Sequence, residues 1–272
     1  LNEDTYEKAH KVLFEEASLR ALEKAGLAKE KVDFFIGGDL INQITPTSFT
    51  AKTIGAGYFG LFGACSTSME GLALSAFIIN NGGAKCIVTG SASHNAAVEK
   101  QFRYPTEYGA QKPPTSQWTV TGAGASVVMA QGEGPVVTSA TVGKVVDMGL
   151  TDPMNMGGAM APAAVDTIET HFRDRNIDAS HYDLIATGDL GHIGREVAFD
   201  LMKKHGTDIP EEKFQDCGLM IYREDQPVLA GASGAGCSAV VTYGHLLNRM
   251  KKGELRRILV VATGALLSPL TF

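Results

Sequence analysis

Residues Val32–Leu40 read VDFFIGGDL, and residues Tyr182–Leu190 read YDLIATGDL. Each stretch is a short apolar run that ends in Gly-Asp-Leu, and each follows a segment whose apolar residues have helical spacing, at 5–24 and 161–175. Short apolar runs between helical segments are typical of buried strands in a parallel sheet. The two copies therefore indicate an α/β fold built from two similar halves.

Other landmarks of this repeat follow in the same order in both halves. Gly63–Ser66 reads GACS, and Gly234–Ser238 reads GAGCS. Each of these stretches precedes a helical segment and then an apolar run that ends in Thr-Gly, at 89–90 and 263–264. Any two α/β segments share some features, but several landmarks in the same order favour a duplication.

The periodicity predicts the elements of the two halves, which we assign to residues 1–134 and 135–272. After an irregular loop at 94–118, the first half is expected to end in a strand at 124–130 that is free to run antiparallel. The second half opens with a strand-like run, Val136–Val146, for which the first half has no counterpart. We expect a βαβαβαββ plan in both halves, with the first and the last strand missing from this chain. The other predicted elements are a helix at 69–80 and strands at 58–62, 86–90 and 184–187.

Composition argues against several classes of function. The chain has 272 residues, with 24 Lys and Arg against 30 Asp and Glu and a net charge of −6, so we expect no nucleic-acid surface. The four cysteines lack CxxC spacing, which argues against a zinc site or a disulfide framework and favours a reducing compartment. No apolar stretch is long enough to span a bilayer, and the first residues do not resemble a signal peptide. We therefore expect no metal, no cofactor and no transmembrane segment.

Cys65 lies in the small-residue stretch GACSTS, Gly63–Ser68, directly before the helix expected at 69–80. Unpaired backbone N–H groups and the helix dipole favour a thiolate at a helix N-terminus. A cysteine in this position can act as a nucleophile or contact a bound anion. The alternative is purely structural, because small residues also let a helix lie close to a sheet and most buried cysteines are inert.

The order of these elements, with a cysteine before the third helix of the first half, resembles the thiolase fold. The stretch Thr121–Val128 is similar to the last strand of ketoacyl synthases, and Gly231–Gly236 is similar to the glycine loop of their second half. The resemblance implies a layered α/β/α/β/α core. It also implies a homodimer in which the strand at 58–62 pairs with its own copy.

Longer stretches resemble one group within this superfamily, the thiolase-like sporulation proteins of spore-forming bacteria. These stretches are residues 63–70, 91–95, 102–109 and 147–157. The resemblance implies binding of dipicolinic acid, alone or with calcium, its uptake into the developing spore and its release on germination. It also implies membrane proteins of the same operon as partners. The expected location is the forespore or spore, soluble or peripheral at the inner spore membrane.

A condensing enzyme of this fold needs a His/His or His/Asn pair beside its cysteine. The first of these positions falls at about Gly188 and the second in the loop Gly231–Gly236, and neither contains a histidine. We therefore expect a binding protein without catalysis. The alternatives are a ketoacyl-synthase-like acyltransferase that uses Cys65, and a structural scaffold for a membrane complex.

The expected ligand residues follow from this interpretation. Two helix starts, one at Cys65 and one in the second-half glycine loop, are expected to converge and to offer backbone donors to an anion. His94 and His192 are placed to reach the same pocket, with a surface or structural role as the alternative for each. Arg103 and Arg195 are the candidate cations for a carboxylate. The predicted ligand-binding residues are Cys65, His94, His192, Ser233 and Gly234.

Overall fold

The computed structural model describes residues 2–102, 112–265 and 267. Its first half contains α1 (Tyr6–Lys24), β1 (Phe34–Gly38), α2 (Thr45–Ile54), β2 (Gly57–Gly60), α3 (Thr67–Asn80), β3 (Cys86–Ser93), α4 (Asn95–Phe102), β4 (Trp118–Thr119) and β5 (Gly122–Met129). Its second half contains α5 (Met156–Arg175), β6 (Leu184–Thr187), α6 (Gly191–His205), β7 (Phe214–Asp216), α7 (Cys217–Met220), β8 (Ala232–Ser233), α8 (Ala235–Ala239), α9 (Leu247–Lys251) and β9 (Ile258–Val261).

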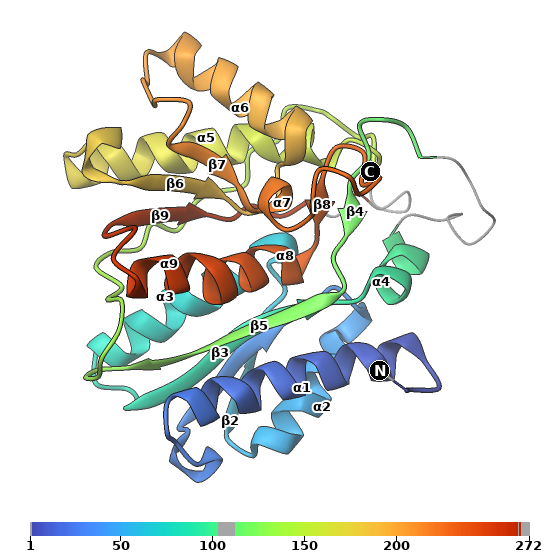
Figure 1. Ribbon diagram of the computed structural model, residues 1–272, viewed down its shortest axis with the longest axis vertical. Coiled ribbons are helices and arrows are strands. Elements are labelled where there is room, and N and C mark those ends of the chain that lie inside the picture. Colours follow the sequence, from blue (N-terminus) through green and yellow to red (C-terminus); the bar gives the residue numbers. More distant parts are fainter. Residues whose placement is uncertain (1, 103–111, 266, 268–272) are drawn as a thin grey trace.

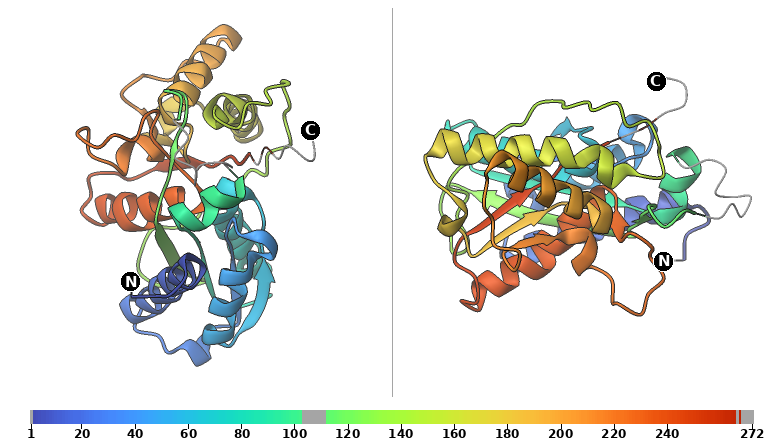
Figure 2. Two further views of the ribbon diagram at one scale, coloured as in Figure 1. Left: turned by 90° about the vertical axis from the view of Figure 1, so that its right-hand side faces the viewer. Right: turned by 90° about the horizontal axis from the view of Figure 1, so that it is seen from above.

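The elements are stacked as alternating layers of helices and sheets (Figure 1). α5 and α6 cover the outer face of one sheet, and α1 and α2 cover the outer face of the other. α3 lies between the two sheets together with α8 and α9. The side view in Figure 2 shows the same order, with α6 at one end of the molecule and α1 at the other. The α/β/α/β/α order that the sequence predicts is confirmed.

The sheets explain how the two halves are joined. In the first half the strand order is β2-β1-β3-β5, with β1 parallel to β2 and β3, and β5 antiparallel to β3 as expected. In the second half the order is β7-β6-β9, and all pairs are parallel. The short strands β4 and β8 pair in parallel, so that Thr119 of the first half lies opposite Ser233 of the second.

Local sequence accounts for the elements of the first half. Phe35 and Ile36 of β1 are fully buried, and every residue of β3 is buried, as expected for strands covered on both faces. α1 begins where the hydroxyl of its N-cap Thr5 accepts the N–H of Lys8 at 3.2 Å. It ends before Gly26, whose φ of 66° is the left-handed conformation favoured by glycine after a helix.

Small residues let the two halves approach closely at the centre. The Ser91 hydroxyl of β3 donates to the carbonyl of Ala235 in α8 at 2.5 Å. A Cβ on Gly124 of β5 would lie 2.5 Å from the carbonyl carbon and oxygen of Ala239, so only glycine fits between β5 and α8. α8 also contacts the turn Ala64–Ser66. The start of α8 and the cysteine turn therefore lie together between the sheets.

One predicted strand is wrong. Val136–Val146 contains no strand, and Val142 and Val145 are 91% and 95% exposed. The segment runs along α5, where the Thr141 hydroxyl contacts the ring of His171 at 2.8 Å. Because β6 is hydrogen-bonded to β7 on one side and to β9 on the other, this segment finds no place inside the sheet.

The predicted loop at 94–118 is also partly wrong, because it contains α4. Ala97 and Val98 of this helix are buried and form a small apolar cluster with Leu40 and Ala64. α4 has eight residues, which is too short a segment for the spacing of apolar residues to indicate a helix. Within the described residues there is no strand before α1 and none after β9.

Candidate functional site

Cys65 lies in a tight turn at the start of α3. The turn Ala64–Ser66 is a 3₁₀ turn, and Ala64 has a φ of 51°, a left-handed conformation that is uncommon for a residue with a Cβ. The second half holds this turn from the other side, since a Cβ on Gly264 would lie 2.4 Å from the carbonyl oxygen of Gly63. Cys65 is only 1% exposed, so its sulfur faces the interior rather than bulk water.

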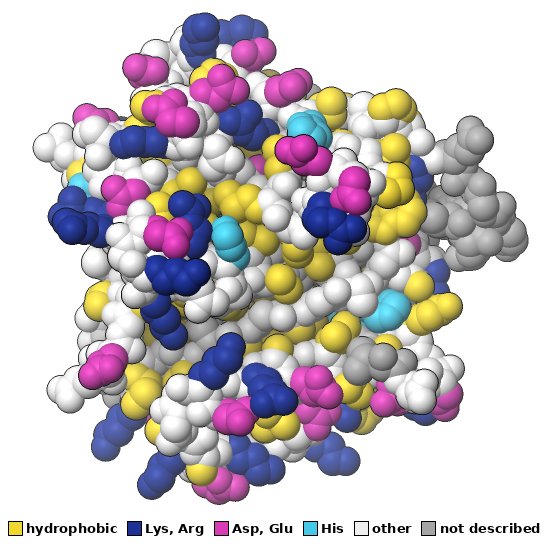
Figure 3. All heavy atoms as spheres, viewed as in Figure 1, with side chains coloured by type: hydrophobic (Ala, Val, Ile, Leu, Met, Phe, Trp, Pro, Cys, Tyr) yellow, Lys and Arg dark blue, Asp and Glu magenta, His cyan; other side chains and the backbone are white. Residues whose placement is uncertain are grey.

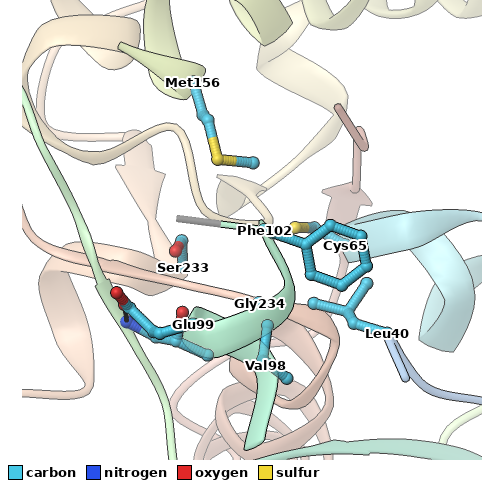
Figure 4. Close-up of a pocket in the computed structure, with 9 residues that line it drawn as sticks. Leu40, Cys65, Val98, Glu99, Phe102, Met156, Ser233 and Gly234 are labelled. Carbon is cyan, nitrogen blue, oxygen red and sulfur yellow. Dashed lines mark hydrogen bonds between the residues drawn. The ribbon is translucent and has the colours of Figure 1, made fainter. Parts of the chain in front are cut away.

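A small pocket opens beside this cysteine (Figure 4). The loop after β1, the cysteine turn, α4 and β4 contribute from the first half, and the start of α5 and β8 contribute from the second. Side chains from both halves point into the same space in Figure 4, with Phe102 and Leu40 near the sulfur of Cys65. The lining residues are Leu40, Cys65, Val98, Glu99, Phe102, Thr119, Met156, Ser233 and Gly234.

The pairing of β4 with β8 brings the two halves of the pocket together. The buried amide of Gln117 donates to the carbonyl oxygens of Asp189 and Ala232, each at 2.7 Å. The N–H of Gly234 donates to Oδ2 of Asp189 at 2.8 Å, which holds the backbone at Gly234 with a φ of 109°. These bonds fix Ser233 and Gly234 against Thr119 at one edge of the pocket.

A buried ion pair lies on the wall of the pocket. The Lys112 ammonium is 2.6 Å from Oε2 of Glu99, and their side chains are 7% and 4% exposed. Oε1 of Glu99 accepts the N–H of Thr119 at 3.3 Å. The ammonium also lies 4.4 Å from the centre of the Trp118 ring, a cation–π distance. The charge of Glu99, which lines the pocket, is therefore paired with that of Lys112.

Three of the five predicted ligand residues, Cys65, Ser233 and Gly234, line the pocket. His94 and His192 do not. The ring of His94 lies against Tyr6, with the ring centres 5.3 Å apart, and burial lowers the pKa of this imidazole. His192 is exposed at the start of α6 and is not among the lining residues. Their contact with a ligand stays a prediction.

Of the two candidate cations from the sequence, the structure places only Arg195. Arg195 donates from Nε and Nη2 to the carbonyl of Phe214, at 2.9 and 2.7 Å, so its guanidinium supports the structure between α6 and β7. Arg103 lies outside the described residues. Sequence reasoning missed Glu99, which lines the pocket, and its buried partner Lys112. It also missed four apolar lining residues: Leu40, Val98, Phe102 and Met156.

The second-half counterpart of Cys65 has a different environment. Cys237 lies in α8 and is fully buried. Burial raises the pKa of its thiol well above the ordinary value, and the nearby carboxylate of Asp189 raises it further. Cys237 is therefore an inert core thiol, and only Cys65 of this pair reaches the pocket.

The two positions expected for helper histidines contain no histidine. Gly188 follows β6, and a Cβ there would lie 3.1 Å from Cα of Ala262, so the position is filled by neighbouring backbone. No histidine is among the described residues that line the pocket.

The described residues also contain no group of three or more His, Cys, Asp or Glu arranged to hold a metal ion. None of the helices in the described part of the chain has both the length and the apolar character of a bilayer span.

Comparison with known proteins identifies the relatives of this chain. Residues 1–272 match the model of the family described as stage V sporulation protein AD. Stage V sporulation protein AD of Bacillus subtilis is 50% identical over 269 residues, which are 98% of this chain and 79% of that protein.

Solved structures show the fold. The 3-oxoacyl-[acyl-carrier-protein] synthase III from Aquifex aeolicus matches with a TM-score of 0.65 at 16% identity, over 98% of this chain and 83% of that chain. A variant of OleA from Xanthomonas campestris, solved with cerulenin, matches with a TM-score of 0.66 at 15% identity, over 98% and 78%. These likenesses confirm the thiolase-like fold. With a family match over its whole length, the chain belongs to the stage V sporulation protein AD family.

Proposed function

We propose that this sporulation protein binds dipicolinic acid in the Cys65 pocket and acts, without catalysis, in its uptake into the spore and its release on germination. Membership of a stage V sporulation family supports the process. The choice of ligand is supported by the lining of the pocket, which is apolar on one side and polar on the other. Apolar side chains of α4, α5 and the loop after β1 suit a flat aromatic ring, and the polar edge at Thr119 and Ser233 suits carboxylate groups.

The same lining favours binding over catalysis. Acyl transfer with carbon–carbon bond formation needs a base and a donor to the developing oxyanion beside the thiolate. The two positions for these groups, at Gly188 and in the loop Gly231–Gly236, contain no histidine. Cys65 remains as a small, polarisable side chain that contacts the ligand.

Calorimetry with dipicolinate tests this site. Phe102→Ala removes an apolar wall, and we expect binding to weaken by about tenfold, since burying an aromatic contact of this kind contributes about 1.5 kcal/mol. Cys65→Ala is expected to weaken binding by a smaller factor. Asp200→Ala, an exposed position on α6 outside the lining residues, is the matched control and should bind as the wild type does. Unchanged binding in both Phe102→Ala and Cys65→Ala would remove the pocket from the proposal. Titrations with and without calcium test whether the ion enters with the ligand.

The alternative function, a ketoacyl-synthase-like acyltransferase, is favoured by one observation, the position of Cys65 at the start of α3. Incubation of the same protein samples with acyl-CoA, followed by measurement of their intact mass, separates the two functions. We expect no adduct. An acyl group on Cys65 that is absent from Cys65→Ala would favour the enzyme.

We also propose that the protein works as a homodimer, at the inner spore membrane and beside membrane proteins of the same operon. β2 is at the edge of its sheet, and the side chains of Phe59 and Phe62 beside it are 43% and 51% exposed, which supports pairing of two β2 strands. Light scattering is expected to give twice the chain mass, and Phe59→Asp should give a monomer. If the wild type is monomeric, the protein has a scaffold or binding role that needs no second copy.

Basic and acidic side chains are mixed over the face shown in Figure 3, which gives no support to a nucleic-acid partner there.

A further inference from the structure

Glu99 alone is charged among the described residues that line the pocket. A carboxylate ligand entering the pocket therefore meets a carboxylate on the wall. Between groups this close in a water-poor site, like charges repel strongly. The pocket can accept an anion only if something next to Glu99 cancels its charge.

Lys112 is the group next to Glu99. Its ammonium is 2.6 Å from Oε2, and both side chains are almost completely buried. The N–H of Thr119 holds the other carboxylate oxygen, and the ring of Trp118 lies against the ammonium. Because both partners are held on several sides, the pair keeps its geometry when a ligand enters.

Two other cations of the described residues, one on α4 and one on α6, have partners elsewhere. Lys100 lies on α4, as Glu99 does, but it pairs with Glu7 and its side chain is 42% exposed. Arg195 donates to the carbonyl of Phe214. Among the described residues, the cation paired with Glu99 is Lys112.

We infer that the Glu99–Lys112 pair sets the charge that the pocket accepts, and that Lys112 is the residue that makes it a site for anionic aromatic ligands. The inference rests on the ligand site proposed above and adds its charge selectivity. Lys112 cancels the charge of Glu99, whose other carboxylate oxygen is held by the N–H of Thr119 at the edge of the pocket.

Two ligands of nearly the same outline separate charge from shape. Dipicolinate is a dianion at neutral pH, and pyridine-2,6-dicarboxamide is neutral. Calorimetry with both ligands is carried out on the wild type, Glu99→Gln, Lys112→Met, the double variant Glu99→Gln/Lys112→Met, and the control Lys100→Met. Thermal unfolding of each variant shows that it is folded.

The expected order of affinity for dipicolinate follows the charge of the wall. Glu99→Gln should bind about tenfold tighter than the wild type, Lys112→Met about tenfold weaker or not at all, and the double variant between these two. Lys100→Met should equal the wild type. The dicarboxamide should bind all variants within about twofold, because a neutral ligand does not respond to the wall charge.

The design keeps the inference testable if Lys112→Met does not fold, since it leaves a buried carboxylate without its partner. In that case the dipicolinate affinities of Glu99→Gln and of the double variant test the inference. Weaker dipicolinate binding by Glu99→Gln, or equal shifts for both ligands, would mean that the pair only supports the structure, and would overturn the inference while the proposed function stands. If the wild type binds neither ligand, the proposed function falls as well.

Discussion

An alanine at Gly194 is expected to destabilise the protein by about 2 kcal/mol or more, as overpacking between two rigid elements does. Gly194 of α6 faces Gly157 in the first turn of α5. A Cβ on Gly194 would lie 2.5 Å from the carbonyl oxygen of Gly157 and 2.8 Å from its Cα. These are backbone atoms that cannot rotate away, so the two helices must separate.

The effect should reach the pocket. Met156, which lines the pocket, is the neighbour of Gly157. Separation of α5 from α6 therefore moves one apolar wall of the ligand site. We expect Gly194→Ala to weaken ligand binding as well as stability, although Gly194 is not among the lining residues.

Gly244→Ala is the matched control. Gly244 is also helical, but a Cβ there would meet nothing within 4 Å. Alanine should therefore leave stability unchanged or raise it by up to about 1 kcal/mol through helix propensity. Urea unfolding followed by circular dichroism measures both variants. Equal stabilities for Gly194→Ala and Gly244→Ala would show that α5 and α6 can separate without a loss of stability.

The order of strands and helices could be predicted because a buried parallel strand is a local pattern. Leu184–Thr187 was predicted and is observed with the same bounds as β6. β3 runs three residues beyond the predicted end at Gly90, because residues 91–93 pair with residues 122–124 of β5. The extended end also contacts the other half. The Ser91 hydroxyl donates to the carbonyl of Ala235, a contact between distant parts of the chain that no window of sequence contains.

The pocket was predictable only where the repeat pointed to it. Cys65 and Gly234 belong to the repeated landmarks, Ser233 directly precedes Gly234, and all three line the pocket. Glu99 could not be found in this way. In the sequence it belongs to a short polar segment that resembles a solvated helix face, and its role depends on burial beside Lys112. A buried charge has meaning only with its partner, and that partner is set by the tertiary fold.

Asp216→Ala is expected to destabilise the protein by about 3 kcal/mol, because it leaves several buried donors without an acceptor. The carboxylate is fully buried at the end of β7. It accepts the hydroxyl of Thr187 at 2.6 Å and the N–H groups of Leu190 and Gly191 at 2.7 and 3.0 Å. One side chain thus joins the end of β6 to the start of α6.

The control for this substitution is Asp200→Ala. Asp200 is an exposed carboxylate on α6, so its removal should change stability by no more than about 0.5 kcal/mol. Urea unfolding at one pH compares the two variants. A loss for Asp216→Ala as small as that for Asp200→Ala would mean that water replaces the carboxylate at these donors.

The pH dependence of stability gives a second measurement on the same group. Burial raises the pKa of Asp216 above its ordinary value of 3.8, against the lowering effect of its hydrogen bonds from Thr187, Leu190 and Gly191. The folded protein therefore holds this proton more tightly than the unfolded chain does. The contribution of Asp216 to stability is greatest below pH 3.8 and falls as the pH rises through the raised value.

Asp216→Asn keeps the shape of the side chain and cannot ionise, so it isolates this contribution from all other titrating groups. As the pH rises above 3.8, the free energy of unfolding of the wild type should fall relative to that of Asp216→Asn. The opposite slope, with the wild type gaining on the variant, would mean that the hydrogen bonds to the carboxylate outweigh its burial. In that case Asp216 holds the start of α6 as an anion, and the cost of Asp216→Ala should grow with pH.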